Sequence, residues 1–109
     1  MHELSITQNI VDIASRYAGT NRVRVVRIEI GKLSAISPEA MSFCFDVCKE
    51  GTTLSEATLE IAMIDATAGC RQCGKLVRVD DPPWKCICGS EELNLLSGLE
   101  MKLKDMEIV

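Results

Sequence analysis

The sequence is poor in histidine and in aromatic side chains. Of its 109 residues a single one, His2, is histidine, and Phe, Trp and Tyr together make up 4%. The sequence contains no His-Glu-x-x-His pair and no glycine-rich loop ending in Lys-Ser or Lys-Thr. No second histidine is present to act as a general base for a cysteine nucleophile. We therefore expect a protein that is not an enzyme.

The chain also lacks an excess of basic charge. Twelve Lys and Arg residues stand against 16 Asp and Glu, which gives a net charge of −4. Binding to nucleic acid or to an anionic membrane needs clustered cations, so we expect neither partner.

Long apolar runs are absent as well. A membrane span needs about 20 apolar residues, and a signal peptide needs a basic start before an apolar run. Neither pattern is present, so the expected location is the cytoplasm. In that reducing compartment the six cysteines are expected to be metal ligands or buried thiols rather than disulfides.

Two amphipathic helices are predicted. Apolar residues recur at spacings of three and four over residues 4–17, which is typical of a helix with one buried stripe. Ser37 is a good N-cap and Pro38 suits the first helical position, so a second helix should begin there and end before Gly51. The expected buried stripes are Ile6, Ile10, Ile13 and Tyr17, flanked by Val11 and Ala14, in the first helix, and Ala40 or Met41, Cys44, and Val47 or Cys48 in the second.

Three strands are predicted from the alternation of apolar and polar residues. Residues 23–30 and 58–64 alternate regularly, as a half-exposed strand does. A third alternating segment begins near Leu99, and its phase slips at Lys104 and Asp105. We therefore expect a β-bulge or a break in the strand at that point.

Four cysteines form two closely spaced pairs. Cys70 and Cys73 are spaced C-x-x-C, whereas Cys86 and Cys88 are spaced C-x-C, and a glycine follows each pair. Paired thiolates in tight turns suit tetrahedral zinc with Zn–S distances of about 2.3 Å, and four of them leave no open position for a catalytic water. Iron of the rubredoxin type would use the same ligands. The short C-x-C spacing constrains the geometry of this site.

The order of the predicted elements indicates an α+β fold. Two helices can cover one face of a three-stranded sheet, which makes a small α/β domain. The cysteine-rich segment interrupts this domain before its last strand. We expect a zinc-ribbon-like domain over residues 67–92, inserted into a domain formed by residues 1–66 and 93–109.

Cys44 and Cys48 lie four residues apart on the predicted second helix. A second metal site or a redox pair would use such thiols. Free cysteine is also among the most frequently buried residue types, and we favour the interpretation that both are small core residues.

His2 stands beside the amino terminus. The amine of Met1, the His2 amide nitrogen once deprotonated and the His2 imidazole could close adjoining chelate rings around one ion. Glu3 adds a further amide and a carboxylate. Such a nitrogen-rich, tetragonal set suits Ni(II) or Cu(II) better than Zn(II). The alternative is that His2 is an ordinary frayed terminal residue.

Taken together, these segments resemble the HypA/HybF hydrogenase nickel incorporation proteins. The similarity covers Met-His-Glu-Leu-Ser at residues 1–5, Ile-Glu-Ile-Gly-Lys-Leu-Ser at 28–34, the helix over 37–48 with its Phe43-Cys44-Phe45, and the cysteine quartet. It runs nearly end to end. One departure is Cys86-Ile87-Cys88, which stands where relatives usually have C-x-x-C.

The resemblance implies a metallochaperone that carries Ni(II) to the large-subunit precursor of [NiFe] hydrogenase. It implies a HypB-type GTPase as a partner and, in some bacteria, a supply of nickel to urease maturation proteins. His2 matches the essential nickel ligand, Glu3 its neighbouring ligand or modulator, and the four cysteines the ligands of a structural Zn(II). Some relatives carry an acidic neighbour of the nickel site where this chain has Ser37 and Glu39.

Two other functions are compatible with parts of the pattern. A zinc-ribbon module that binds another protein and has no nickel role would need the quartet alone. A thiol redox protein would show a reversible disulfide and would stay active after chelation.

Overall fold

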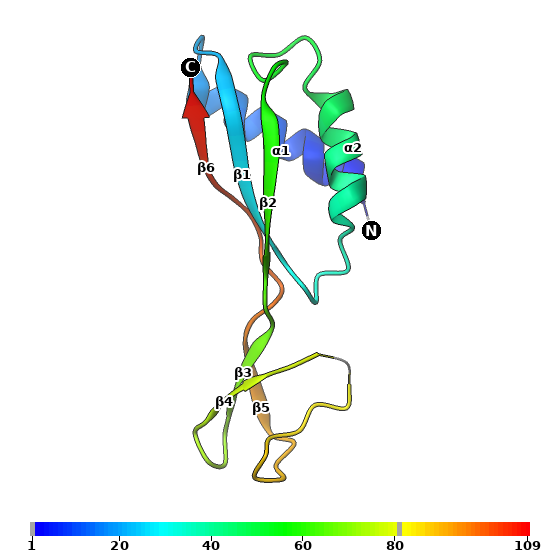
Figure 1. Cartoon of the computed structure of the whole chain (residues 1–109), viewed down its shortest axis with the longest axis vertical. Coiled ribbons are helices and arrows are strands. Elements are labelled where there is room, and N and C mark those ends of the chain that lie inside the picture. Colours follow the sequence, from blue (N-terminus) through cyan, green and yellow to red (C-terminus); the bar gives the residue numbers. More distant parts are fainter. Residues whose placement is uncertain (1, 81) are drawn as a thin grey trace.

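The computed structural model describes residues 2–80 and 82–109. Over these ranges the chain forms an elongated molecule of 53 × 22 × 16 Å built on two three-stranded sheets (Figure 1). The mixed helix and sheet content confirms the predicted fold class. The elements in order are α1 (Glu3–Ala18), β1 (Val23–Gly31), α2 (Pro38–Cys48), β2 (Thr58–Ile64), β3 (Thr67–Cys70), β4 (Leu76–Arg78), β5 (Leu93–Ser97) and β6 (Met101–Ile108).

The first sheet has the strand order β2-β1-β6. Its central strand β1 runs parallel to β2 and antiparallel to β6. Arg27 pairs with Asp105 while Ile28 pairs with Leu103, so Lys104 is the extra residue on β6. This irregularity confirms the slip predicted there and shows that it is a bulge within a continuous strand rather than a break.

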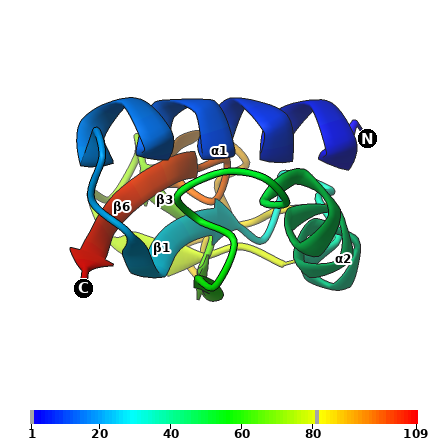
Figure 2. The ribbon, with the colours of Figure 1, turned by 90° about the horizontal axis from the view of Figure 1, so that it is seen from above.

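Helix α1 lies across one face of the first sheet (Figure 2). It buries Ile10, Val11, Ala14 and Ala18 against the apolar residues of β1. The predicted stripe was therefore partly wrong, because Ile13 is 41% exposed and Tyr17 is 79% exposed. The buried face of α1 is instead centred on Val11, Ala14 and Ala18, so Ile13 and Tyr17 lie outside it.

Helix α2 begins where the sequence predicts. The Ser37 side chain accepts a hydrogen bond from the Ala40 N–H at 3.2 Å, and Pro38 occupies the first helical position. Its predicted buried stripe needs correction, because Phe45 is fully buried together with the predicted Met41, whereas Val47 is 55% exposed. The helix packs against α1 (Figure 2) and also contacts β2 (Figure 1), so Phe45, one position away from the predicted stripe, becomes buried.

The second sheet has the order β4-β3-β5 and is antiparallel throughout. Its buried core is small and consists of Ala66, Ala68 and Val79, against which Trp84 and Leu93 pack. Because β5 pairs with β3, residues 93–97 belong to this sheet rather than to the first one. The division of the chain into separately folding domains stays a prediction.

The two sheets meet at a tight crossing of glycines. A Cβ atom on Gly31 would lie 2.1 Å from the Gly98 carbonyl oxygen, so no side chain fits there. The Leu33 N–H donates to the same carbonyl at 2.8 Å. Asp65 adds ion pairs with Lys32 and with Arg78, the latter at 2.9 Å. The second sheet is thereby attached to the first by several independent contacts.

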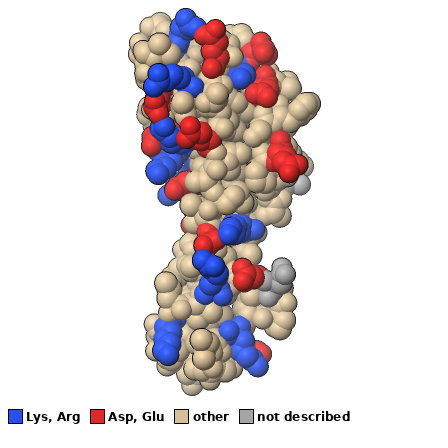
Figure 3. Space-filling model, in the orientation of Figure 1, with Lys and Arg blue, Asp and Glu red and all other residues tan. Residues whose placement is uncertain are grey.

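The face of the first sheet that lies opposite α1 carries ion pairs. Arg27 bonds Glu60 at 3.1 Å and Asp105 at 3.0 Å, and it also pairs with Glu107. Cationic and anionic side chains are therefore interspersed on this face (Figure 3). Among the described residues, no helix combines the length and apolar character needed to cross a membrane.

Candidate metal centres

The four predicted cysteine ligands converge at the far end of the second sheet. Cys70 ends β3, Cys73 lies in the turn before β4, and Cys86 and Cys88 lie in the turn before β5. The Sγ atoms of Cys70 and Cys88 are 3.7 Å apart, and those of Cys73 and Cys86 are 3.5 Å apart. All four sulfurs lie within 4.8 Å of one another.

This arrangement fits a tetrahedral zinc ion. Four sulfurs at about 2.3 Å from one ion are about 3.8 Å from each other, close to the separations found here. The C-x-C spacing is accommodated by a tight turn, in which the Gly89 N–H donates to the Cys86 carbonyl at 2.8 Å. Gly89 adopts a φ of +95°, which favours glycine. The short spacing therefore does not prevent convergence.

Local hydrogen bonds favour the thiolate form that a metal needs. The backbone N–H of Cys73 donates to the Cys70 sulfur at 3.5 Å and, with a smaller contribution from the Gln72 N–H, lowers the pKa of Cys70 to about 6. Cys70 and Cys86 are buried, whereas Cys73 and Cys88 are exposed. One side of the cluster is therefore open to metal entry.

At the other end of the molecule, His2 and Glu3 stand at the start of α1. His2 is the N-cap residue, its side chain is exposed, and its carbonyl accepts the Ile6 N–H at 3.1 Å. The Glu3 carboxylate accepts the backbone N–H of Ser37 at 3.0 Å, and this bond lowers the pKa of Glu3. The predicted contribution of the Met1 amine lies outside the described residues.

The Glu3–Ser37 hydrogen bond was missed by sequence reasoning. The two residues are 34 positions apart and belong to different helices, so no local pattern connects them. Of the two positions named as neighbours of the nickel site, the structure brings Ser37 to Glu3, and it leaves Glu39 exposed in the first turn of α2.

Cys44 and Cys48 are half-buried rather than fully buried. Cys48 packs against the main core, and burial raises the pKa of its thiol. Within residues 2–80 and 82–109, the quartet is the one group of three or more His, Cys, Asp or Glu side chains placed to share an ion. Asp12 lies near Cys48, but these residues are not among those that the described structure places to share an ion.

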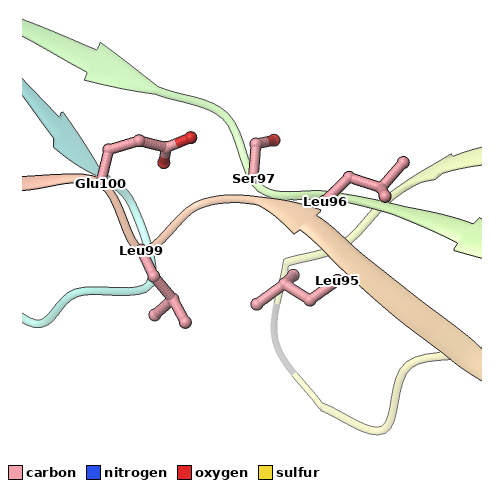
Figure 4. A pocket seen from close by; sticks show the side chains of 5 residues that line it. All are labelled: Leu95, Leu96, Ser97, Leu99 and Glu100. Atoms are coloured by element: carbon pink, nitrogen blue, oxygen red, sulfur yellow. The ribbon is translucent and has the colours of Figure 1, made fainter.

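A further hollow of about 260 Å³ lies where β5 leads into β6. Figure 4 shows its lining by Leu95, Leu96, Ser97, Leu99 and Glu100. The Glu100 carboxylate accepts the Gly98 N–H at 2.7 Å, and the Ser97 hydroxyl donates to the Asp65 carbonyl at 2.8 Å. The polar side chains of this hollow therefore form hydrogen bonds with the backbone at the place where the two sheets join.

Comparison with known proteins gives a consistent result. Residues 1–108 match the family described as HypA, hydrogenase/urease nickel incorporation, metallochaperone. The chain is 53% identical to hydrogenase maturation factor HypA of Trichormus variabilis over 108 residues, which is 99% of this chain and 96% of that protein. It is 42% identical to the protein of the same name from Geotalea daltonii, over the whole of both chains.

Solved structures show the same fold. The solution structure of the Ni metallochaperone HypA from Helicobacter pylori superposes with a TM-score of 0.71 at 22% identity, covering 100% of this chain and 98% of that one. A second solution structure of a HypA protein gives a TM-score of 0.75 and covers 100% and 97% of the two chains.

Proposed function

Because this chain belongs to the HypA family of hydrogenase and urease nickel incorporation metallochaperones, we propose that it binds Ni(II) through His2 and Glu3 and delivers the ion to the large-subunit precursor of [NiFe] hydrogenase. The observation that carries this proposal is the family match over residues 1–108, which includes the only histidine of the chain. The exposed position of His2 at the start of α1 supports it.

The ligand chemistry suits a transported ion. His2 supplies an imidazole and an amide nitrogen, and nitrogen donors of this kind suit Ni(II). The Glu3 carboxylate accepts a hydrogen bond from the Ser37 N–H, and this bond holds the start of α1 against the start of α2. The backbone amide of Glu3 is then the group that lies next to His2. An acceptor protein replaces these ligands one at a time. Acid weakens binding because protons compete with the metal for the imidazole.

Affinity alone does not select nickel at this site. Cu(II) binds nitrogen ligands more strongly than Ni(II) does, so the choice of metal rests on its availability and on the partner proteins. The proposed partners are a HypB-type GTPase and the hydrogenase precursor, with urease maturation proteins as a second route. In this role the protein transfers an ion without catalysing a reaction.

The quartet of Cys70, Cys73, Cys86 and Cys88 holds a structural Zn(II) in this proposal. Four thiolates complete a tetrahedral zinc site, and the small core of the second sheet needs such a support. Zinc-bound thiolates persist in a reducing compartment, which supports the cytoplasm as the place of action.

Nickel titration of the zinc-loaded, untagged protein tests the nickel site. We expect His2→Ala to lose the nickel bound by the wild type, whereas Ser5→Ala, an exposed change in the same helical turn, keeps it. Zinc content measured in parallel must be equal in all three proteins. Unchanged stoichiometry and affinity in His2→Ala would leave the zinc-ribbon interaction module as the better function.

An N-terminal extension separates the ligands at this site. Adding residues before Met1 removes the free amine from the chelate and keeps the His2 side chain. A large loss of nickel affinity would assign the amine as a ligand, and retained affinity would leave the imidazole as the main donor.

A further inference from the structure

Helix α2 carries two large apolar side chains on the side that faces away from the core. Its buried residues are Met41 and Phe45, whereas Phe43 is 71% exposed and Val47 is 55% exposed. Residues four positions apart are neighbours on a helix surface, so Phe43 and Val47 form one apolar row. A grouped apolar surface with a polar rim marks a site of interaction.

A row of carboxylates runs beside this apolar row. Glu39 precedes Phe43 by four positions, and Asp46 follows it by three. Glu50 follows Val47 by three positions, in the turn after α2. All three acidic side chains are exposed. Because residues three or four apart lie side by side on a helix, each exposed apolar side chain is bordered by a carboxylate.

The negative charge of this row is largely unbalanced. Lys49 is the only basic residue of α2 and the turn after it. Its ammonium group lies 3.3 Å from Asp46, but it also donates to the Ala57 carbonyl at 3.1 Å and its side chain is only 18% exposed. In the part of the chain that the structure describes, neither Glu39 nor Glu50 forms an ion pair. In the upper half of Figure 3, acidic side chains lie on the α2 side and most basic ones lie on the β6 side.

We infer that the acidic α2 face, formed by Glu39, Phe43, Asp46, Val47 and Glu50, binds a basic amphipathic helix of a partner protein. Apolar side chains of that helix, spaced by three and four residues, pack on Phe43 and Val47. Its Lys and Arg side chains lie over the carboxylates. The apolar contact supplies most of the affinity, and the opposite charges orient the partner and speed its approach.

The charge of this face argues against other occupants. Two copies of the acidic α2 face would bring like charges together, which disfavours self-association through it. An anionic membrane or a nucleic acid is repelled for the same reason. A neutral apolar helix would leave the carboxylates without partners, so a basic helix is the best match.

The acidic α2 face contains none of the proposed metal ligands. The cysteine quartet lies at the far end of the second sheet, and His2 and Glu3 stand at the start of α1. Failure of nickel binding and failure of helix binding are therefore separate experimental results.

Titration with a designed peptide tests the inference. The probe is a fluorescently labelled helical peptide with Leu at positions spaced by three and four and with Lys or Arg on its other face. A control peptide has Glu in place of each Lys and Arg. By fluorescence anisotropy we expect saturable binding of the basic peptide to the zinc-loaded protein, with an affinity that falls as salt is added. The acidic peptide should not bind.

Matched variants assign the binding to α2. Phe43→Ala should raise the dissociation constant of the basic peptide at least about tenfold, because it removes a central apolar anchor. Tyr17→Ala removes an exposed aromatic ring from α1 and should leave the constant unchanged. The double variant Glu39→Gln with Glu50→Gln should reduce the salt dependence, whereas Glu91→Gln, an exposed change in the loop before β5, should not.

Hydrogen exchange locates the contact on the molecule. Amides of α2 and of the turn after it should become better protected when the basic peptide is added, with amides of β4 unchanged. Absence of binding, equal binding of the two peptides or an affinity that is insensitive to Phe43→Ala overturns the inference. Self-association that Phe43→Ala weakens would overturn it as well, because a second copy would then be the occupant.

Discussion

The carboxylate of Glu3 accepts the backbone N–H of Ser37 at 3.0 Å, and this bond joins the first residue of α1 to the N-cap of α2. Thr7 reinforces the contact, because its hydroxyl lies 2.7 Å from the Glu3 carbonyl and 3.4 Å from the Met41 sulfur. Glu3, which belongs with His2 to the proposed nickel site, is thus also part of the helix packing. The start of α1 is held in place by α2.

The Glu3 carboxylate should therefore affect stability and nickel binding by fixing the start of α1 against α2. We expect Glu3→Ala to lower the melting temperature and to weaken nickel binding, because it removes the acceptor of the Ser37 N–H. Glu3→Gln keeps an acceptor oxygen and should lie closer to the wild type in both measurements. Thermal unfolding and nickel titration of the two variants check this, and equal effects of both would show that the negative charge is what matters.

Removing zinc should disorder the second sheet selectively. Its core is small, whereas the first sheet has α1 and α2 packed on it. Trp84 is the only tryptophan and packs against the core of the second sheet, so its fluorescence reports on this region. We expect chelation, or the Cys73→Ser variant, to shift Trp84 emission to the red. Cys44→Ser should not, and amides of β1 should stay protected from hydrogen exchange in each case.

Two phenylalanines on α2 offer a matched test of the core. Phe45 is 1% exposed and Phe43 is 71% exposed. Phe45→Ala should lower the free energy of unfolding by about 3–5 kcal/mol, because it leaves a cavity in a packed core. Phe43→Ala should change it by no more than about 0.5 kcal/mol, as is usual for a surface position. Denaturant unfolding measures both, and similar losses would contradict the assigned burial.

Acid should remove the stabilisation that Glu107 gives the folded protein through its ion pairs with Arg24 and Arg27. Hydrogen bonds from Arg24 and then Arg27 lower the pKa of Glu107 below that of a free carboxyl. A depressed folded-state pKa stabilises the protein above the unfolded-state pKa, about 4.3 for glutamate, and this contribution is lost as pH falls through the lower folded value.

We therefore expect Glu107→Gln to be less stable than the wild type at neutral pH, with the difference closing in acid. Denaturant unfolding at a series of pH values measures this difference. Glu50→Gln, an exposed change in the turn after α2, serves as the control. A difference that persists at the acid end would point to a contribution other than charge.

Much of the fold could be predicted because its signals are local. Ser37 and Pro38 mark the start of α2, alternation marks β1 and β2, and the slip at Lys104 marks the bulge. The buried face of α1 was harder to predict, since apolar residues lie on more than one side of the helix. Packing of Ala14 and Ala18 on the sheet decided which side is buried, and Ile13 and Tyr17 were left exposed.

The same distinction between local signals and tertiary packing applies to the candidate metal sites. The sequence by itself determined the cysteine pairs and the terminal histidine, because ligand types and short spacings are properties of the chain. Only the tertiary structure decided that the C-x-C and C-x-x-C turns converge, that β5 joins the second sheet, and that Glu3 bonds to Ser37. These contacts join residues far apart in sequence, so they depend on how whole elements pack, and no local pattern of residues encodes that.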